Sequence, residues 1–149
     1  MRIIVDADGC PVRQITEKTA KVYQLELLFV TDYNHILHSD YAQIVTVDQQ
    51  KDSADLKIAA MAQPNDIIVT GDYGVAALTL AKGCAPIGFS GIWYTDETID
   101  GFLWNRHIGM QTRRRGKHLK GPKKRTEQMD LEFEAGLKQL IEKRKREKR

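Results

Sequence analysis

Short apolar runs alternate with amphipathic segments along the first hundred residues of this chain. The run Ile3–Val5 consists of three β-forming side chains with no polar residue between them, which is typical of a strand buried on both faces. Comparable runs predict strands at residues 25–30, 44–47, 67–70 and 85–89, with a short edge strand at 92–94. Apolar positions at helical spacing predict helices at 11–23, 53–62, 73–82 and 96–107.

This alternation predicts an α/β fold in three layers, with a central, mainly parallel sheet between two layers of helices. If the strands at 3–5 and 67–70 are neighbours, the chain reverses its winding direction between them, and ligands are expected at that crevice. A last apolar stripe, at 126–143, predicts a helix that packs on the same body. We therefore divide the chain into an α/β domain at 1–110, a basic arm at 111–125 and a C-terminal helix at 126–149.

The net charge of +3 conceals an uneven distribution. Residues 1–105 contain seven Lys and Arg against 14 Asp and Glu, whereas residues 106–149 contain 16 against six. An acidic body suits a cation, and a basic final third suits a polyanion. There is no signal-peptide pattern and no apolar run long enough to span a membrane, and the two cysteines have neither metal nor disulfide spacing. These features predict a cytoplasmic protein without a membrane partner.

Two carboxylates, Asp6 and Asp8, follow the first predicted strand directly. Gly9 and Pro11 come next, and Pro11 suits the first turn of a helix. The acids are therefore expected on a loop at the carboxyl edge of the sheet, where an oxygen-only ligand set suits Mg²⁺ or Mn²⁺. The structural alternative is that Asp8 caps the helix. Cys10 lies at the same helix end, which would lower the pKa of its thiol, although a small buried side chain is the simpler interpretation.

The second half of the chain repeats this arrangement. Asp72 follows the strand at 67–70, and Asp55 lies in the first turn of the helix after the third strand. Because parallel strands end at one edge, both carboxylates are expected near Asp6 and Asp8, in a pocket for a cation. Helix capping is the alternative for each, with Asp72 as an N-cap and Asp52 with Asp55 as a capping box.

The basic arm combines high charge with little apolar surface. It contains one large apolar side chain and no acid, which favours contacts with phosphates without reading of sequence. A solubilising linker is the alternative. The residues expected to bind nucleic acid are Arg113, Arg114, Arg115, Lys117, Lys120, Lys123, Lys124 and Arg125.

Several short motifs occur in one order: Asp6-Ala7-Asp8-Gly9-Cys10-Pro11-Val12, Ser53-Ala54-Asp55, Thr70-Gly71-Asp72-Tyr73, Ala76-Ala77-Leu78 with Ala81-Lys82-Gly83, Tyr94-Thr95, Arg106 and Gly121-Pro122-Lys123. With these motifs the chain, from Asp6 to about Leu137, resembles the YaiI/YqxD family of uncharacterised bacterial proteins. That family is in turn similar to the PIN-like nucleases, which include the NYN group.

The resemblance implies a PIN-like fold, in which acids at the carboxyl edge of a parallel sheet use a divalent metal to cut RNA. Asp6, Asp55 and Asp72 match the aspartates shared with PIN-like domains, and Asp8 matches a second aspartate of the family itself. The chain departs from the family at two positions. Gly9 stands where Ala is usual, and Ser90 stands where an arginine is frequent.

Three functions follow from these features. The first is a metal-dependent phosphodiesterase that acts on RNA or single-stranded nucleic acid, with Mg²⁺ or Mn²⁺ held by Asp6, Asp8, Asp55 and Asp72. The second is a phosphatase like the haloacid dehalogenase group, with Asp6 as nucleophile, Asp8 as acid, and Thr31 and Lys51 as helpers. The third is an RNA-binding protein without catalytic activity.

Overall fold

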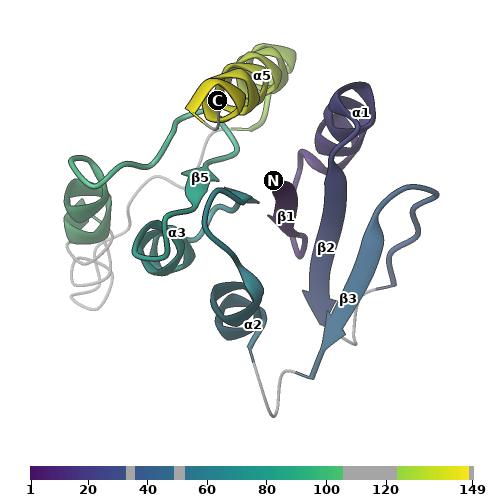
Figure 1. Ribbon diagram of the computed structural model, residues 1–149, viewed down its shortest axis with the longest axis horizontal. Helices are drawn as coiled ribbons and strands as arrows, with labels where there is room; N and C mark the ends of the chain where they lie inside the picture. Colours follow the sequence, from purple (N-terminus) through teal and green to yellow (C-terminus); the bar gives the residue numbers. More distant parts are fainter. Residues whose placement is uncertain (33–35, 49–52, 106–123, 148–149) are drawn as a thin grey trace.

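A computed structural model describes residues 1–32, 36–48, 53–105 and 124–147. Its centre is a five-stranded sheet in the order β3-β2-β1-β4-β5, and every strand pair is parallel (Figure 1). The strands are β1 (Arg2–Asp6), β2 (Glu26–Asp32), β3 (Gln43–Val47), β4 (Ile67–Val69) and β5 (Ala85–Ile87). The predicted α/β fold with a parallel sheet is confirmed. The strands β1 and β4 are neighbours, so the crevice expected between their carboxyl ends is present.

Helices cover both faces of this sheet. They are α1 (Arg13–Tyr23), α2 (Ala54–Met61), α3 (Tyr73–Leu80) and α5 (Glu127–Glu147), and residues 99–105 are also helical. One face carries α1 and α5, and the other carries α2 and α3 (Figure 1). None of the helices in the described ranges has the length and apolar composition that a membrane crossing requires.

The apolar run of β1 is explained by its place in the middle of the sheet. Ile3 and Val5 pack into the core beneath α1 and α5, whereas Ile4 packs into the core beneath α2 and α3. All three side chains are fully buried because successive side chains of a strand point to opposite faces. Paired with β2 on one side and β4 on the other, β1 has no free edge.

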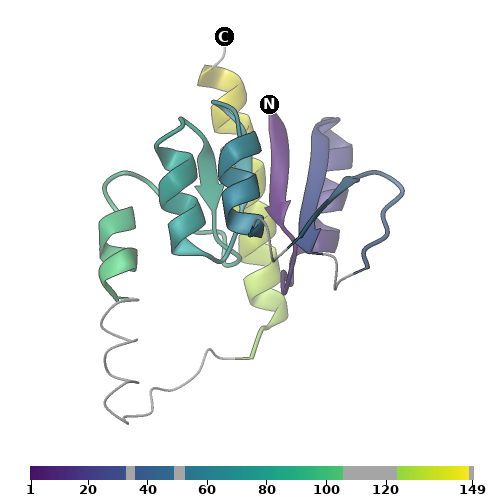
Figure 2. The same cartoon turned by 90° about the horizontal axis from the view of Figure 1, so that it is seen from below.

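The C-terminal helix α5 packs closely against the segment after β5. Its apolar stripe lies in the core, through Phe133, Leu137, Leu140 and Ile141. A side chain at Gly136 would place a Cβ 2.6 Å from the carbonyl oxygen of Gly91, so both glycines allow the close approach. The indole N–H of Trp93 donates to the carbonyl of Gly136 at 3.0 Å. Helix α5 runs from the carboxyl edge of the sheet to its amino edge, alongside the strands (Figure 2).

Most predicted elements shift by a few residues at their ends, and two differences have a cause in the hydrogen bonds of the chain. Helix α1 begins at Arg13 rather than Pro11, because a turn closed by the Cys10 amide on the Ala7 carbonyl, at 3.2 Å, comes first. The expected edge strand at 92–94 is a single antiparallel bridge between Ile87 and Trp93, because the chain turns back sharply through residues 88–91.

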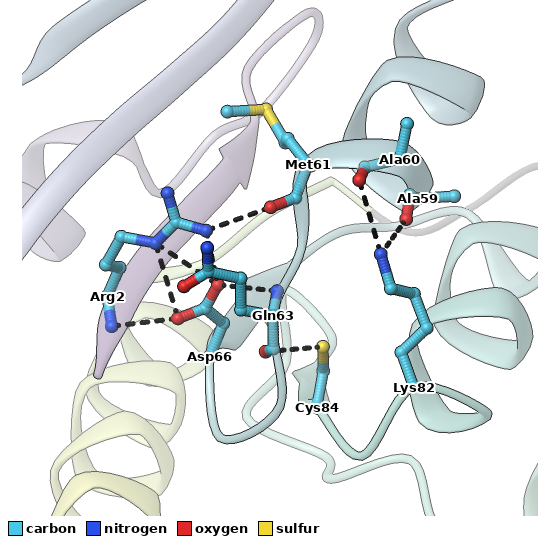
Figure 3. Close-up of polar contacts among 8 residues, drawn as sticks. All are labelled: Arg2, Ala59, Ala60, Met61, Gln63, Asp66, Lys82 and Cys84. Atoms are coloured by element: carbon cyan, nitrogen blue, oxygen red, sulfur yellow. Dashed lines mark hydrogen bonds and ion pairs between the residues drawn. The ribbon is translucent and has the colours of Figure 1, made fainter.

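At the amino edge, Arg2 and Asp66 join the starts of β1 and β4 (Figure 3). The Arg2 guanidinium donates to Asp66 at 2.7 Å and to the Met61 carbonyl at 2.9 Å, while the Arg2 amide donates to the other Asp66 oxygen at 3.1 Å. The amide of Gln63 completes the set at 2.9 Å. Nearby, Lys82 donates to the Ala59 carbonyl in the last turn of α2. Asp66 is only 2 % exposed, so these bonds replace its lost hydration.

We expect Asp66→Ala to lower the free energy of unfolding by about 3 kcal/mol, because it leaves Arg2 and two amides without their acceptor. Urea denaturation measures this change. Glu134→Ala is the control: it removes the exposed pair with Lys138 and should change stability by no more than about 0.5 kcal/mol. A decrease below about 1 kcal/mol in Asp66→Ala would show that the bonds do not hold the two strands together.

Candidate functional site

The ends of β1 and β4 meet at the carboxyl edge of the sheet. Val5 is paired with Val69, so the residues that follow, Asp6 and Thr70, are adjacent. The Thr70 hydroxyl donates to a carboxylate oxygen of Asp6 at 3.1 Å. The chain leaves β1 towards one face of the sheet, through α1, and leaves β4 towards the other, through α3 (Figure 1). This is the topological switch point at which α/β sheets bind ligands.

A cleft of about 480 Å³ opens at this point. Three of its lining residues are acids that come from two separate loops, and two are aromatic. The lining residues are Asp6, Asp8, Gly71, Asp72, Tyr73 and Phe89. The structure therefore brings three of the four predicted acids to one concave surface.

Asp6 lies at the centre of this negative charge. Burial raises the pKa of its carboxyl to about 6, and the nearby carboxylates of Asp72, Asp8 and Asp55 add to the increase. The hydrogen bond from Thr70 acts in the opposite direction because it favours the charged form of the carboxyl. The three neighbouring acids thus all lie close enough to Asp6 to influence its ionisation.

Asp8 contacts β2 instead of the helix that follows it. The Thr31 hydroxyl donates to one of its oxygens, and the Asp32 amide donates to the other at 3.1 Å. The capping alternative for Asp8 is wrong, because the N-cap position of α1 is Val12. The bonds to β2 fix the Asp8 carboxylate against the neighbouring strand, on the wall of the cleft.

Asp72 occupies a position that suits both of its predicted roles, because it lines the cleft and also begins α3. It is the N-cap of α3, and its Oδ1 accepts from the amides of Gly74 at 2.7 Å and Val75 at 3.4 Å. Its own amide donates to the Thr70 hydroxyl at 3.0 Å. Thr70 therefore contacts both Asp6 and Asp72, and it links the two acidic loops directly.

Asp55 lies in the first turn of α2 and is not among the residues that line the cleft. Its negative charge nevertheless contributes to the raised pKa of the Asp6 carboxyl. The N-cap of α2 is Ser53, whose side chain accepts from the Leu56 amide at 3.4 Å. The capping box expected from Asp52 is therefore wrong, and Asp52 itself lies outside the described residues.

The acids suit a hydrated ion better than a closed metal cage. Across the described residues, no three His, Cys, Asp or Glu side chains stand in an arrangement that could hold a metal ion. The ligand atoms are all carboxylate oxygens, which hard cations prefer. Mg²⁺ retains several waters and commonly takes only one or two protein carboxylates, so this edge fits such an ion.

Most of the predicted nucleic-acid contacts, from Arg113 to Lys123, lie outside the described residues. Lys124 is exposed. Arg125 donates to the carbonyl of Phe89, a lining residue of the cleft, at 2.8 Å, and pairs with Asp130 at 2.6 Å. The last residue of the basic arm is thus bonded to the wall of the acidic cleft.

Two aromatic residues of the cleft, Tyr73 and Phe89, are absent from the predicted set. Tyr73 directly follows Asp72, and Phe89 lies two residues after the end of β5, so their positions at the carboxyl edge are the signal that could have identified them. For Cys10, the simpler interpretation as a small buried side chain is confirmed, and the alternative of a lowered pKa is wrong. Burial raises the pKa of its thiol to about 11, against the smaller opposing effects of the Val12 amide and Arg13.

Comparison with known proteins identifies uncharacterised relatives. The family model described as "Uncharacterized BCR, YaiI/YqxD family" matches residues 4–143. The chain is 47 % identical to a UPF0178 protein of Alkaliphilus oremlandii over 92 % of this chain and 88 % of the relative. It is 44 % identical to a UPF0178 protein of Lachnoclostridium phytofermentans over 95 % of this chain and 97 % of the relative. No solved structure matches the chain.

The raised pKa of Asp6 predicts a stability that falls with pH. Between an ordinary Asp pKa near 4 and the native value of about 6, the native state holds a proton that the unfolded chain has lost. The free energy of unfolding should therefore drop by about 2 to 3 kcal/mol as the pH rises through this window. Asp6→Asn cannot ionise, so its stability should exceed that of the parent above pH 6 and differ little near pH 4.

Urea denaturation of both proteins from pH 4 to pH 7.5 measures the difference. If the free energy of unfolding changed with pH by the same amount in the parent and in Asp6→Asn, Asp6 would not be the group whose ionisation lowers the stability.

Proposed function

Because the chain belongs to the YaiI/YqxD family of uncharacterised bacterial proteins, we propose its function from its own acidic cleft: a metal-dependent phosphodiesterase that acts on RNA or single-stranded nucleic acid. The observation that carries the proposal is the convergence of Asp6, Asp8 and Asp72 on one cleft at the switch point of the sheet. Retaining several carboxylates in one place costs stability, which is typical of functional sites.

Within this cleft, Asp6 with Asp8 or Asp72 would hold Mg²⁺ or Mn²⁺. When bound, such an ion supplies an activated water and neutralises charge on the phosphate. Asp6 ionises fully only above about pH 6, so metal binding and activity should rise through that pH. Thr70 contacts both Asp6 and Asp72, and Asp55 adds negative charge that acts on Asp6.

An acidic cleft repels phosphates, so a nucleic-acid substrate needs cationic side chains close by. The basic arm ends at Arg125, which is bonded to the cleft wall at Phe89. This connection favours a polyanion over a small neutral substrate. The resemblance to PIN-like nucleases supports the same substrate class.

The phosphatase alternative is less well supported. It requires Asp8 to donate a proton, yet both of its oxygens accept hydrogen bonds, from Thr31 and from the Asp32 amide, which suits an ionised carboxylate. Its other helper, Lys51, lies outside the described residues. An RNA-binding protein without catalytic activity remains as an outcome of the first experiment below.

We expect Asp6→Asn and Asp72→Asn each to reduce Mn²⁺-dependent cleavage of a single-stranded RNA by about 100-fold or more, because each removes a charged oxygen at the proposed metal site. Asparagine is as good an N-cap as aspartate, so Asp72→Asn should keep α3 intact, which circular dichroism can check.

Asp40→Asn is the matched control, because it changes an exposed carboxylate outside the cleft and should cleave like the parent. Parental activity in Asp6→Asn would overturn the catalytic assignment. Salt-dependent binding without cleavage by the parent, in Mg²⁺ or Mn²⁺, would favour the RNA-binding protein.

The basic arm should neutralise most of the phosphates that the protein touches. Replacing its first seven basic residues by Gln, and leaving Arg125 because of its bonds to the body, should weaken binding of a single strand. The dependence of log K on log salt should flatten by about 0.7 for each phosphate that the variant no longer neutralises. Fluorescence anisotropy from 50 to 300 mM salt measures both the affinity and this slope.

The control variant replaces Lys138, Lys143 and Arg146 by Gln on the outer surface of α5, and it should retain the parental slope. An unchanged slope in the arm variant would identify the arm as a linker.

A further inference from the structure

The ring of Phe89 occupies an unusual place for an apolar side chain, because it lines a cleft that also holds three carboxylates. Part of the side chain packs against the core, and the residue is half-buried. Three of its ring atoms lie 2.7 to 3.2 Å from the point where a Cβ on Gly71 would stand. The ring therefore rests on the backbone of Gly71, next to Asp72, and any larger residue at position 71 would displace it.

The backbone at Phe89 is fixed from the other side by Arg125. The guanidinium donates to the Phe89 carbonyl at 2.8 Å and is itself oriented by Asp130 at 2.6 Å. Asp130 lies in the first turn of α5, which is held against the Gly91 loop by the close contact at Gly136. The position of the ring is thus set by β5, by α5 and by the absence of a side chain at Gly71.

A second aromatic ring on the cleft wall is equally constrained. Tyr73 packs at a centroid distance of 5.2 Å from Phe102 and 5.8 Å from Tyr94, within an aromatic cluster beside α3. The Phe89 side chain has no oxygen with which to bind a hard cation. Aromatic surfaces beside a phosphate-processing site are instead the usual partners of nucleobases, which stack on them regardless of sequence.

We infer that Phe89 is a base-stacking platform of the acidic cleft, so that the substrate is a strand whose base beside the scissile phosphate is unpaired. This inference rests on the proposed function. A paired base has both faces covered within the helix and cannot lie on the ring. Arg125, a cationic side chain, is bonded to the backbone of the platform residue itself, so a positive charge lies beside the ring.

The test uses single-stranded oligonucleotides that carry the fluorescent base 2-aminopurine at successive positions, with Ca²⁺ in place of Mn²⁺ and with strand length checked on a gel. Stacking on an aromatic ring quenches 2-aminopurine. The parent should quench it at one or two positions and should bind the single strand more tightly than the matching duplex. Phe89→Leu, which keeps an apolar side chain for the core, should abolish the quenching and weaken single-strand binding by about tenfold or more.

Phe89→Tyr is the matched control and should quench and bind like the parent, because it keeps a ring at the same position. Unaltered quenching and affinity in Phe89→Leu, or equal affinity of the parent for duplex and single strand, would overturn the inference. The proposed function fails by a different result, namely parental cleavage in Asp6→Asn, so the two failures are distinguishable.

Discussion

The pairing of β1 with a parallel neighbour on each side is the constraint on which the rest of the molecule depends. It forces both faces of the strand under helices, which is why Ile3, Ile4 and Val5 are all apolar. It also makes β1 and β4 end side by side while their following helices lie on opposite faces of the sheet. The loops after the two strands therefore diverge, and the space between them is the acidic cleft.

A carboxylate is paired with a cation at the amino edge of the sheet, whereas several carboxylates lie together at the carboxyl edge. At the amino edge, the buried carboxylate of Asp66 is neutralised by Arg2 and by two amides, and it joins the strands together. At the carboxyl edge, Asp6 is partly buried among other carboxylates, and burial first, then the nearby charges, raises its pKa. The first arrangement stabilises the fold, whereas the second opposes it. A protein keeps destabilising carboxylates of this kind where its function requires them.

Much of the fold could be predicted from the sequence because buried parallel strands leave uninterrupted apolar runs. The run at Ile67–Val69 and the run at Ile3–Val5 identify their strands, and an aspartate after each identifies the edge at which the acids meet. The capping alternative for Asp8 was wrong because capping is a local rule. The actual donors, Thr31 and the Asp32 amide, lie on a strand that only the tertiary fold brings near.

The aromatic part of the cleft was missed for a related reason. The position of Phe89 depends on the backbone of Gly71 and on Arg125, which lie 18 residues before it and 36 residues after it in the chain. The raised pKa of Cys10 likewise follows from packing, which outweighs the influence of the nearby helix end. Local patterns identified the strands and the acids, whereas contacts between distant segments determined which side chains line the cleft together.

Asp72 has two tasks at once, since the carboxylate that lines the cleft also closes the first turn of α3. Any ligand that draws electron density from this carboxylate must weaken its hydrogen bonds with the amides of Gly74 and Val75. Those two protons are therefore natural reporters of occupancy: their chemical shifts and exchange rates register what enters the cleft without any label being attached. Because one carboxylate serves both tasks, a sequence change that frays the start of α3 should also change the affinity of the cleft.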